Sequence, residues 1–286
     1  MAEFDVLCRE IPPGRAASGF REYQQERASF IRTSYGRFCG QFEVGYDVLV
    51  RAVDYVNYGV ERSSWPQHRL VQNILIVENL KPLYSAFERF EKGFYEDGFI
   101  LMRVAYEAFF RVIFLSLHPD DPHFSFADKR TGGKQFQQTN LEKEDLGLDW
   151  STYSFLSHMT HAYKFPVLTR IAQIVRDGGI AEPLTLGFAA HDVDVFSIGV
   201  NILHLIQLFY FRVTRDLLLH PAKAGATHPV LPQLERCCVL WSKFFASHVN
   251  EKLSRVIGDL DDVFAIIVDA EAGNDWRETR RRLRGK

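Results

Sequence analysis

Cysteine is scarce in this chain, which has four in 286 residues. They are Cys8, Cys39, Cys237 and Cys238. No two of them form a C-x-x-C pair, and the adjacent Cys237 and Cys238 would point to different sides of a helix. This spacing argues against a disulfide framework and against the usual zinc ligand sets, and it indicates a protein of the reducing cytoplasm.

The sequence also lacks the short motifs of several common enzyme classes. It has no His-Glu-x-x-His and no Glu-x-x-His, the pairs that zinc proteases and di-iron bundles use. It has no Gly-x-Gly-x-x-Gly, no Walker loop and no Gly-x-Ser-x-Gly elbow. We therefore expect no bound metal, no cofactor and none of the nucleotide-dependent or hydrolase folds built on these motifs.

Charge of one sign is not in excess. The formal net charge is −2 and the sequence pI is near 6.6, which predicts no global attraction to nucleic acid. The chain ends in WRETRRRLRGK, which we expect to be a solvated tail, with a nucleic-acid or acidic-partner contact as the alternative. The first residues lack a basic segment followed by an apolar run, so no secretory signal is expected.

Apolar runs free of polar residues are missing as well. The two longest apolar segments are 99–117, which carries three charges, and 193–211, which carries Asp194, Asn201 and His204. Charged groups at the centre of a membrane cost a few kcal/mol each. We therefore expect buried helices in a soluble protein and no membrane contact.

Aromatic and helix-forming patterns are abundant. Hydrophobic residues make up 47% of the chain, with 24 Phe and 11 Tyr, which is typical of a folded protein. Alternating strand patterns are scarce, so the sequence predicts an all-α, multi-helix bundle. The predicted helices span 17–37, 42–60, 68–92, 96–118, 150–176, 190–219 and 232–270.

We divide the chain into three regions. Residues 1–67 hold N-terminal helices, 68–220 form a central bundle, and 221–286 hold a C-terminal helix and the basic tail. The central region contains a long loop at 119–149 that is rich in polar residues and helix breakers. Loops of this length are often lids, binding loops or disordered insertions.

A first polar stripe lies on the most apolar predicted helix. Arg103, Glu107 and Arg111 recur every four residues, so Glu107 can pair with both arginines. One interpretation is a buried structural ion triad. The other is a pocket wall in which one arginine binds a phosphate or a carboxylate.

Two further stripes carry groups that bind ligands or move protons. Tyr153, Ser157 and His161 share one side of a helix and combine a phenol, a hydroxyl and an imidazole. The third stripe lies on the helix predicted at 190–219 and consists of Asp194, Ser197, Asn201, His204 and Gln207, followed by Thr214 and Arg215. Each stripe has a structural interpretation, in which its groups satisfy one another or face solvent, and a functional one, in which the three meet in a polar centre.

The pairing of an R-x-x-x-E helix with a later Y-x-x-L-S-x-x-x-H helix resembles prokaryotic helical proteins related to the HEPN superfamily, which occur in antiviral and abortive-infection systems. The residues that carry the resemblance are Arg103, Glu107, Tyr153, Leu156, Ser157 and His161, within roughly 70–220. The resemblance implies a HEPN-like core with extra N- and C-terminal helices, a homo-oligomer, RNA as a partner, and a protein partner from a defence system.

Active HEPN ribonucleases carry an Arg followed four to six residues later by a His, and two subunits together form the site. Arg215 and His220 match best, because a polar residue follows the Arg and the His ends a long helix before Pro221. The resemblance implies metal-independent RNA cleavage, with His220 moving protons and Arg215 steadying phosphate charge. A differently used site would include Arg103, Glu107, Tyr153 and His161.

Two function classes follow. The first is a cytoplasmic HEPN-like effector that cleaves or binds RNA in defence or growth arrest. The second is a non-catalytic sensor or interaction bundle whose buried polar network is structural.

Overall fold

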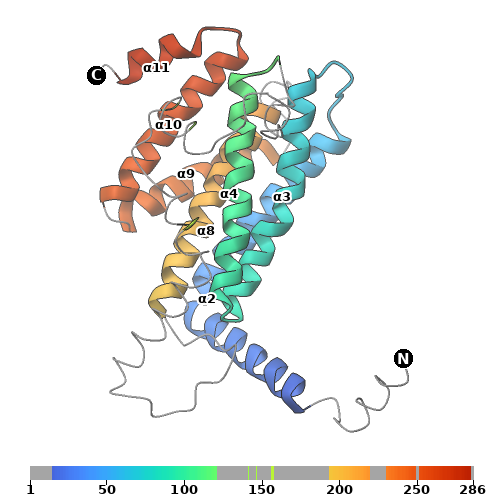
Figure 1. Cartoon of the computed structure of the whole chain (residues 1–286), viewed down its shortest axis with the longest axis vertical. Helices are drawn as coiled ribbons and strands as arrows, with labels where there is room; N and C mark the ends of the chain where they lie inside the picture. The colour runs from blue at the N-terminus through green and yellow to red at the C-terminus, as the bar shows by residue number, and fades with distance from the viewer. Residues whose placement is uncertain are drawn as a thin grey trace, which may run out of the picture.

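The computed structural model describes residues 15–120, 141, 146, 156–157, 193–219, 230–248 and 251–284. These residues form helices and their connections, and no strand occurs among them (Figure 1). The predicted all-α bundle is therefore confirmed for the described part of the chain. Most of the predicted helix at 150–176 and of the loop at 119–149 lies outside the described residues.

The first long helix, α2 (Arg15–Tyr58), corresponds to the two helices predicted at 17–37 and 42–60, joined across a kink. The break between them is shorter than predicted, because the backbone leaves helical geometry at one residue only: Tyr35, with φ −126° and ψ 23°. The break lies between Ser34 and Gly36, a pair of residue types at which helices often kink. The chain therefore bends at Tyr35 and continues as a helix.

The next two helices, α3 (Gln67–Glu91) and α4 (Tyr95–Leu117), match the helices predicted at 68–92 and 96–118, and they pack side by side as an antiparallel hairpin (Figure 1). Gly93 between them has a φ of 81°, a conformation that L side chains rarely adopt. The Phe94 amide donates to the Arg89 carbonyl oxygen at 2.8 Å and closes the turn. Pro82 lies inside α3.

The α3–α4 hairpin packs against α8 (Val193–Val213) through a tight contact of glycines with one ring. A Cβ atom on Gly98 of α4 would lie 2.5 Å from the ring of Phe90, and a Cβ on Gly199 of α8 would lie 2.0 Å from it. The two glycines therefore let the Phe90 ring fit between the helices.

Helix α8 continues into a π-helical turn, η4 (Thr214–Leu219). The single helix predicted at 232–270 is wrong, because this region forms α9 (Val230–His248) and α10 (Glu251–Glu271). The C-terminal segment forms a last helix, α11 (Trp276–Arg284), which buries Trp276 and Thr279. Arg277, Arg281 and Arg282 are exposed, as expected for a solvated run of arginines. Burial of the indole ring holds the arginine-rich end of the chain on the bundle.

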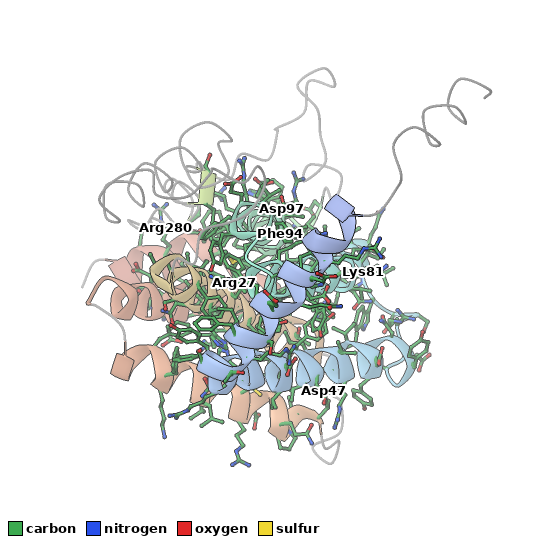
Figure 2. All side chains as sticks on the ribbon, turned by 90° about the horizontal axis from the view of Figure 1, so that it is seen from below. Arg27, Asp47, Lys81, Phe94, Asp97 and Arg280 are labelled. Atoms are coloured by element: carbon green, nitrogen blue, oxygen red, sulfur yellow. The ribbon has the colours of Figure 1, made fainter. Side chains whose placement is uncertain are left out.

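Buried apolar side chains from α2 through α11 form one contiguous core. Helix α2 contacts α3, α8 and α9, and α10 contacts α4 and α9, so helices from all three predicted regions share this core. On α2, the buried Arg27 donates from Nη2 to the Tyr95 hydroxyl at 2.7 Å and joins the first turn of α4 to the core (Figure 2).

One described segment, Phe196–Leu219, is long and apolar enough to cross a membrane by length and composition. Over an 18-residue stretch of this segment the mean hydropathy is 1.4, and 72% of that stretch is buried in the bundle. The core helix of a soluble protein has the same properties.

Candidate functional site

The end of the α8 core helix carries the most strongly charged cluster on this helix. Single turns of π-helix inside longer helices are frequent at functional sites. In η4, Arg215 donates from Nε to Asp216 Oδ1 at 2.6 Å and from Nη2 to Asp216 Oδ2 at 2.9 Å. Arg212 approaches the same carboxylate at 3.5 Å and donates to Asp261 Oδ1 of α10 at 2.7 Å. We refer to Arg212, Arg215, Asp216 and Asp261 as the η4 cluster.

The η4 cluster holds Arg215 in a fixed, charged state. Its side chain is 21% exposed, and that of Asp216 is 13% exposed. The hydrogen bond to Asp216 raises the pKa of Arg215 against the opposing effect of burial. Asp216 takes two of the five N–H donors of the guanidinium group, so the remaining donors keep a defined direction.

A thiol also lies beside this cluster. Burial raises the pKa of Cys238 on α9 to about 11, although the charges of Arg215 and Arg212 oppose the shift. A thiol with this pKa is protonated at neutral pH and is a poor nucleophile. Cys238 therefore packs in the core.

Several predicted site residues fall beyond the part of the chain that the structure describes. These residues are Tyr153, His161 and His220. Ser157 is described: it is helical and half-buried, and it follows the buried Leu156.

On α4, the predicted ion triad is less buried than expected. Arg103 donates from Nε to Glu107 Oε1 at 2.8 Å, and the two side chains are 30% and 31% exposed. Burial lowers the pKa of Arg111, and the charge of Glu107 partly offsets this effect. The stripe is therefore half-buried and does not lie at the centre of the bundle.

The α8 stripe faces α2 and α9. The side-chain amide of Gln207 donates to the Phe42 carbonyl oxygen at 2.9 Å and accepts from Trp241 Nε1 at 3.1 Å. His204 is buried among aromatic rings, and Asn201 is half-buried. Helix α8 meets α4 through different residues, because Tyr210 donates from its hydroxyl to the Ala105 carbonyl oxygen at 2.9 Å.

On α8, Gln207 therefore bonds to α2 and α9. The meeting of all three stripes in a polar centre stays a prediction, because Tyr153 and His161 lie outside the described residues. Helical periodicity shows which residues share a face, but it does not show which neighbour that face meets.

A second buried polar cluster was missed by the sequence analysis. Glu271, the last residue of α10, forms an ion pair with Arg69 and lies 3.5 Å from His68 Nε2, both in the first turn of α3. Gln72 donates to Ser116 Oγ at 2.7 Å and lies 3.5 Å from the other Glu271 oxygen. The only sequence signal is the run of polar residues at the start of α3, because Glu271 lies about 200 positions away.

Glu271 is suited to holding helices together. Burial raises its pKa, but the hydrogen bond from His68 and the charge of Arg69 outweigh burial and lower the pKa to about 2. A carboxylate with this pKa is a weak base at neutral pH. We therefore interpret this cluster as a structural clasp between α3, α4 and α10.

Among the described residues, no group of three or more His, Cys, Asp and Glu side chains could hold a metal ion. Comparison with models of known protein families, with curated proteins and with solved structures found no match.

Proposed function

We propose that this protein is a HEPN-like helical effector that cleaves RNA without a metal ion, with Arg215 and His220 as the reactive pair. The observation that supports the proposal is the η4 cluster: the core helix continues into a π-helical turn in which Asp216 holds the Arg215 guanidinium, five residues before His220 in the sequence. Arg215 is the phosphate-binding group and His220 the proton-transfer group.

In the proposed reaction, a 2′-hydroxyl group of the RNA attacks the neighbouring phosphate of the same strand. The 2′-oxygen bonds to phosphorus while the bond from phosphorus to the 5′-oxygen breaks. One imidazole accepts the 2′ proton, and a protonated imidazole gives a proton to the leaving 5′-oxygen. The products are a 2′,3′-cyclic phosphate and a 5′-hydroxyl end, and Arg215 stabilises the negative charge on phosphorus oxygens in the transition state.

The proposal includes self-association, because the two proton transfers need two groups and a second subunit can supply the second imidazole. It also includes a cytoplasmic location, without membrane contact, and a protein partner in defence or growth arrest. The burial of the Phe196–Leu219 segment inside the bundle supports the absence of membrane contact.

The test is cleavage of a mixed structured-RNA pool by the purified chain in the presence of a chelator. We expect cleavage by the wild type, and loss of cleavage in Arg215→Ala and in His220→Ala. Arg236→Ala is the matched control, because Arg236 is exposed on α9. Loss of activity in His161→Ala alone would instead assign catalysis to the Tyr153 and His161 face. Intact RNA with wild-type oligomer would contradict cleavage as the function.

The second candidate function is a non-catalytic sensor or interaction bundle. Two observations favour it: the buried amide of Gln207 bridges α2 and α9, and the clasp at Glu271 joins α10 to α3 and α4. Such networks specify how helices pack and need no substrate. This candidate predicts that His220→Ala leaves every solution property of the protein unchanged.

A further inference from the structure

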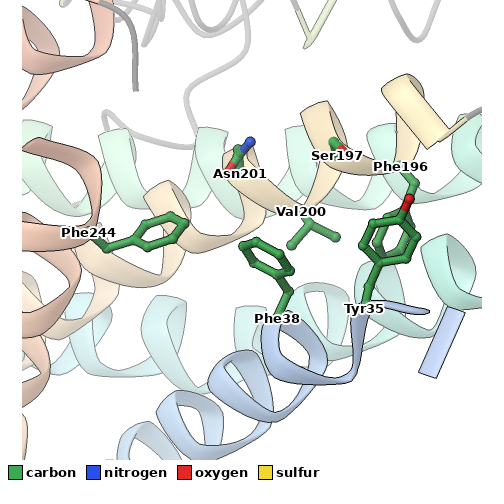
Figure 3. A pocket seen from close by; sticks show the side chains of 7 residues that line it. All are labelled: Tyr35, Phe38, Phe196, Ser197, Val200, Asn201 and Phe244. Atoms are coloured by element: carbon green, nitrogen blue, oxygen red, sulfur yellow. The ribbon is translucent and has the colours of Figure 1, made fainter. Parts of the chain in front are cut away.

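An aromatic cavity of about 240 Å³ lies between α2, α8 and α9, away from the η4 cluster (Figure 3). Four rings line it: Tyr35 and Phe38 from α2, Phe196 from α8 and Phe244 from α9. Asn201 follows Ser197 by one helical turn, and these two α8 residues supply its polar lining. We refer to this feature as the aromatic cavity.

The bend in α2 shapes this cavity. Tyr35 is the one residue of α2 outside helical geometry, and its ring centroid lies 5.1 Å from that of Phe196. One helical turn later, Phe38 lies 6.2 Å from Phe244, nearly perpendicular to it at 74°. Residues in uncommon backbone conformations often line binding sites.

His204 packs next to this region. It is 2% exposed, and its ring nitrogens lie near Gln207 and the Phe38 backbone, although neither forms a hydrogen bond of ordinary geometry with them. Its ring centroid lies 5.8 Å from that of Phe244, and it follows Asn201 by three residues, so it packs against residues that line the aromatic cavity without lining the cavity itself. Buried polar groups without partners are costly and rare.

The imidazole of His204 is neutral at physiological pH. Burial lowers its pKa to about 4, although nearby Gln207 and the Phe38 backbone favour the charged form. A neutral imidazole has one N–H donor and one acceptor nitrogen. Of the residues that line the cavity, Asn201 carries an amide and Ser197 a hydroxyl, and each of these groups can donate and accept, so the polar side of the cavity suits a ligand edge that does both.

We propose that the aromatic cavity binds one heteroaromatic ring of the nucleobase class. The four rings favour stacking, and the polar lining favours a base edge. None of the described residues that line the cavity is charged, so a phosphate or a carboxylate would remain outside it. The volume is below that of pockets for drug-sized ligands, and it suits a single ring system.

This inference goes beyond the proposed function and rests on different residues. Arg215 follows Asn201 by 14 residues, which corresponds to about 20 Å along α8. The base has two sources: a nucleotide of a bound RNA strand, or a free nucleoside. The cavity chemistry is the same for both.

The test is calorimetric titration of the full chain with adenosine, guanosine, cytidine and uridine. A parallel titration uses short single-stranded RNAs with 2′-O-methyl groups, which the proposed reaction cannot cleave. We expect binding of at least one base, weakened about fivefold by Asn201→Ala, the equivalent of one hydrogen bond. Val200→Phe would fill the cavity and abolish binding, whereas Ile198→Ala, on the exposed side of α8, would leave binding unchanged.

Each outcome decides between the sources. Binding of a free nucleoside assigns the aromatic cavity to a small molecule, and binding of the strand alone assigns it to RNA. Absence of both, or equal binding by the wild type and the two cavity variants with native circular dichroism, overturns the inference. RNA cleavage without base binding would support the proposed function and contradict the proposed base site. Base binding without cleavage would support the base site and contradict cleavage as the function.

Discussion

Glu271 and Arg69 lie 202 positions apart in the sequence and form an ion pair at one end of the bundle. Each side chain is 10% exposed, so the pair is shielded from solvent, and His68 and Gln72 occupy the space around the carboxylate. This pair is less exposed than the ion pair on α4, in which the Arg103 and Glu107 side chains remain in contact with water. The two carboxylates therefore differ in their contribution to stability.

The pH dependence of stability depends on Glu271. Its pKa is about 2 in the folded protein against an ordinary value of 4.5, so folding favours the ionised form. This contribution, about 3 kcal/mol, is fully present above pH 4.5 and is lost as the pH falls to 2. We expect the wild type to lose that much more unfolding free energy than Glu271→Gln between pH 5.5 and 2, measured by urea denaturation.

Glu91 provides an internal check on this prediction, because its shift has the opposite sign. Burial raises the pKa of Glu91, and the charge of Arg32 only partly offsets it. Glu91 therefore favours the folded state at low pH, but it is present in both proteins and cancels in the comparison. If the unfolding free energy of the wild type and of Glu271→Gln changed equally with pH, ionisation of Glu271 would contribute nothing to stability.

Glu107→Ala is expected to be mild. An ion pair that is about 30% exposed contributes about 0–1 kcal/mol, whereas removing one partner of a buried pair costs about 3–5 kcal/mol. We therefore expect Glu271→Ala to lower the unfolding free energy several times more than Glu107→Ala. Chemical denaturation of both variants under one condition tests this order. A larger loss of unfolding free energy in Glu107→Ala would show that the ion pair on α4 stabilises the fold more than the Glu271 cluster does.

Helix boundaries were predictable where local chemistry determines them. The predicted helices at 68–92 and 96–118 match α3 and α4 within a residue, because Gly93 ends one helix and the apolar repeat restarts after it. The gap predicted after residue 37 became a bend. The backbone leaves helical geometry at Tyr35 and returns to it at the next residue. We attribute this to packing on both sides of the bend, which outweighs the weak helix propensity of the local sequence.

The packing of α4 against α8 can be tested by substituting a glycine that contacts the Phe90 ring. Gly199→Ala would place a Cβ 2.0 Å from the Phe90 ring, which cannot move away because Gly98 confines its other side. We expect a loss of about 1–3 kcal/mol in unfolding free energy. Gly40→Ala is the matched control: nothing lies within 4 Å of its Cβ, so a helical alanine there would stabilise by up to about 1 kcal/mol.

For the whole molecule, the single contiguous core predicts cooperative unfolding. Buried side chains of the first and last described helices belong to the same apolar cluster, so neither end can detach without exposing the centre. We expect far-ultraviolet circular dichroism and tryptophan fluorescence to follow one coincident transition in urea. An early fluorescence change from Trp276 would instead show that α11 unfolds before the bundle.

The sequence by itself determined the helical class, the bounds of α3 and α4, and the spacing that puts Asn201 and His204 on one side of α8. These features depend on residues within a few positions of one another, where periodicity and turn chemistry act. Only the tertiary structure decided which neighbours those residues meet. Gln207 bonds to the Phe42 carbonyl 165 positions away, and the rings of the aromatic cavity come from three helices. Such contacts arise from packing complementarity over the whole bundle, which no local pattern contains.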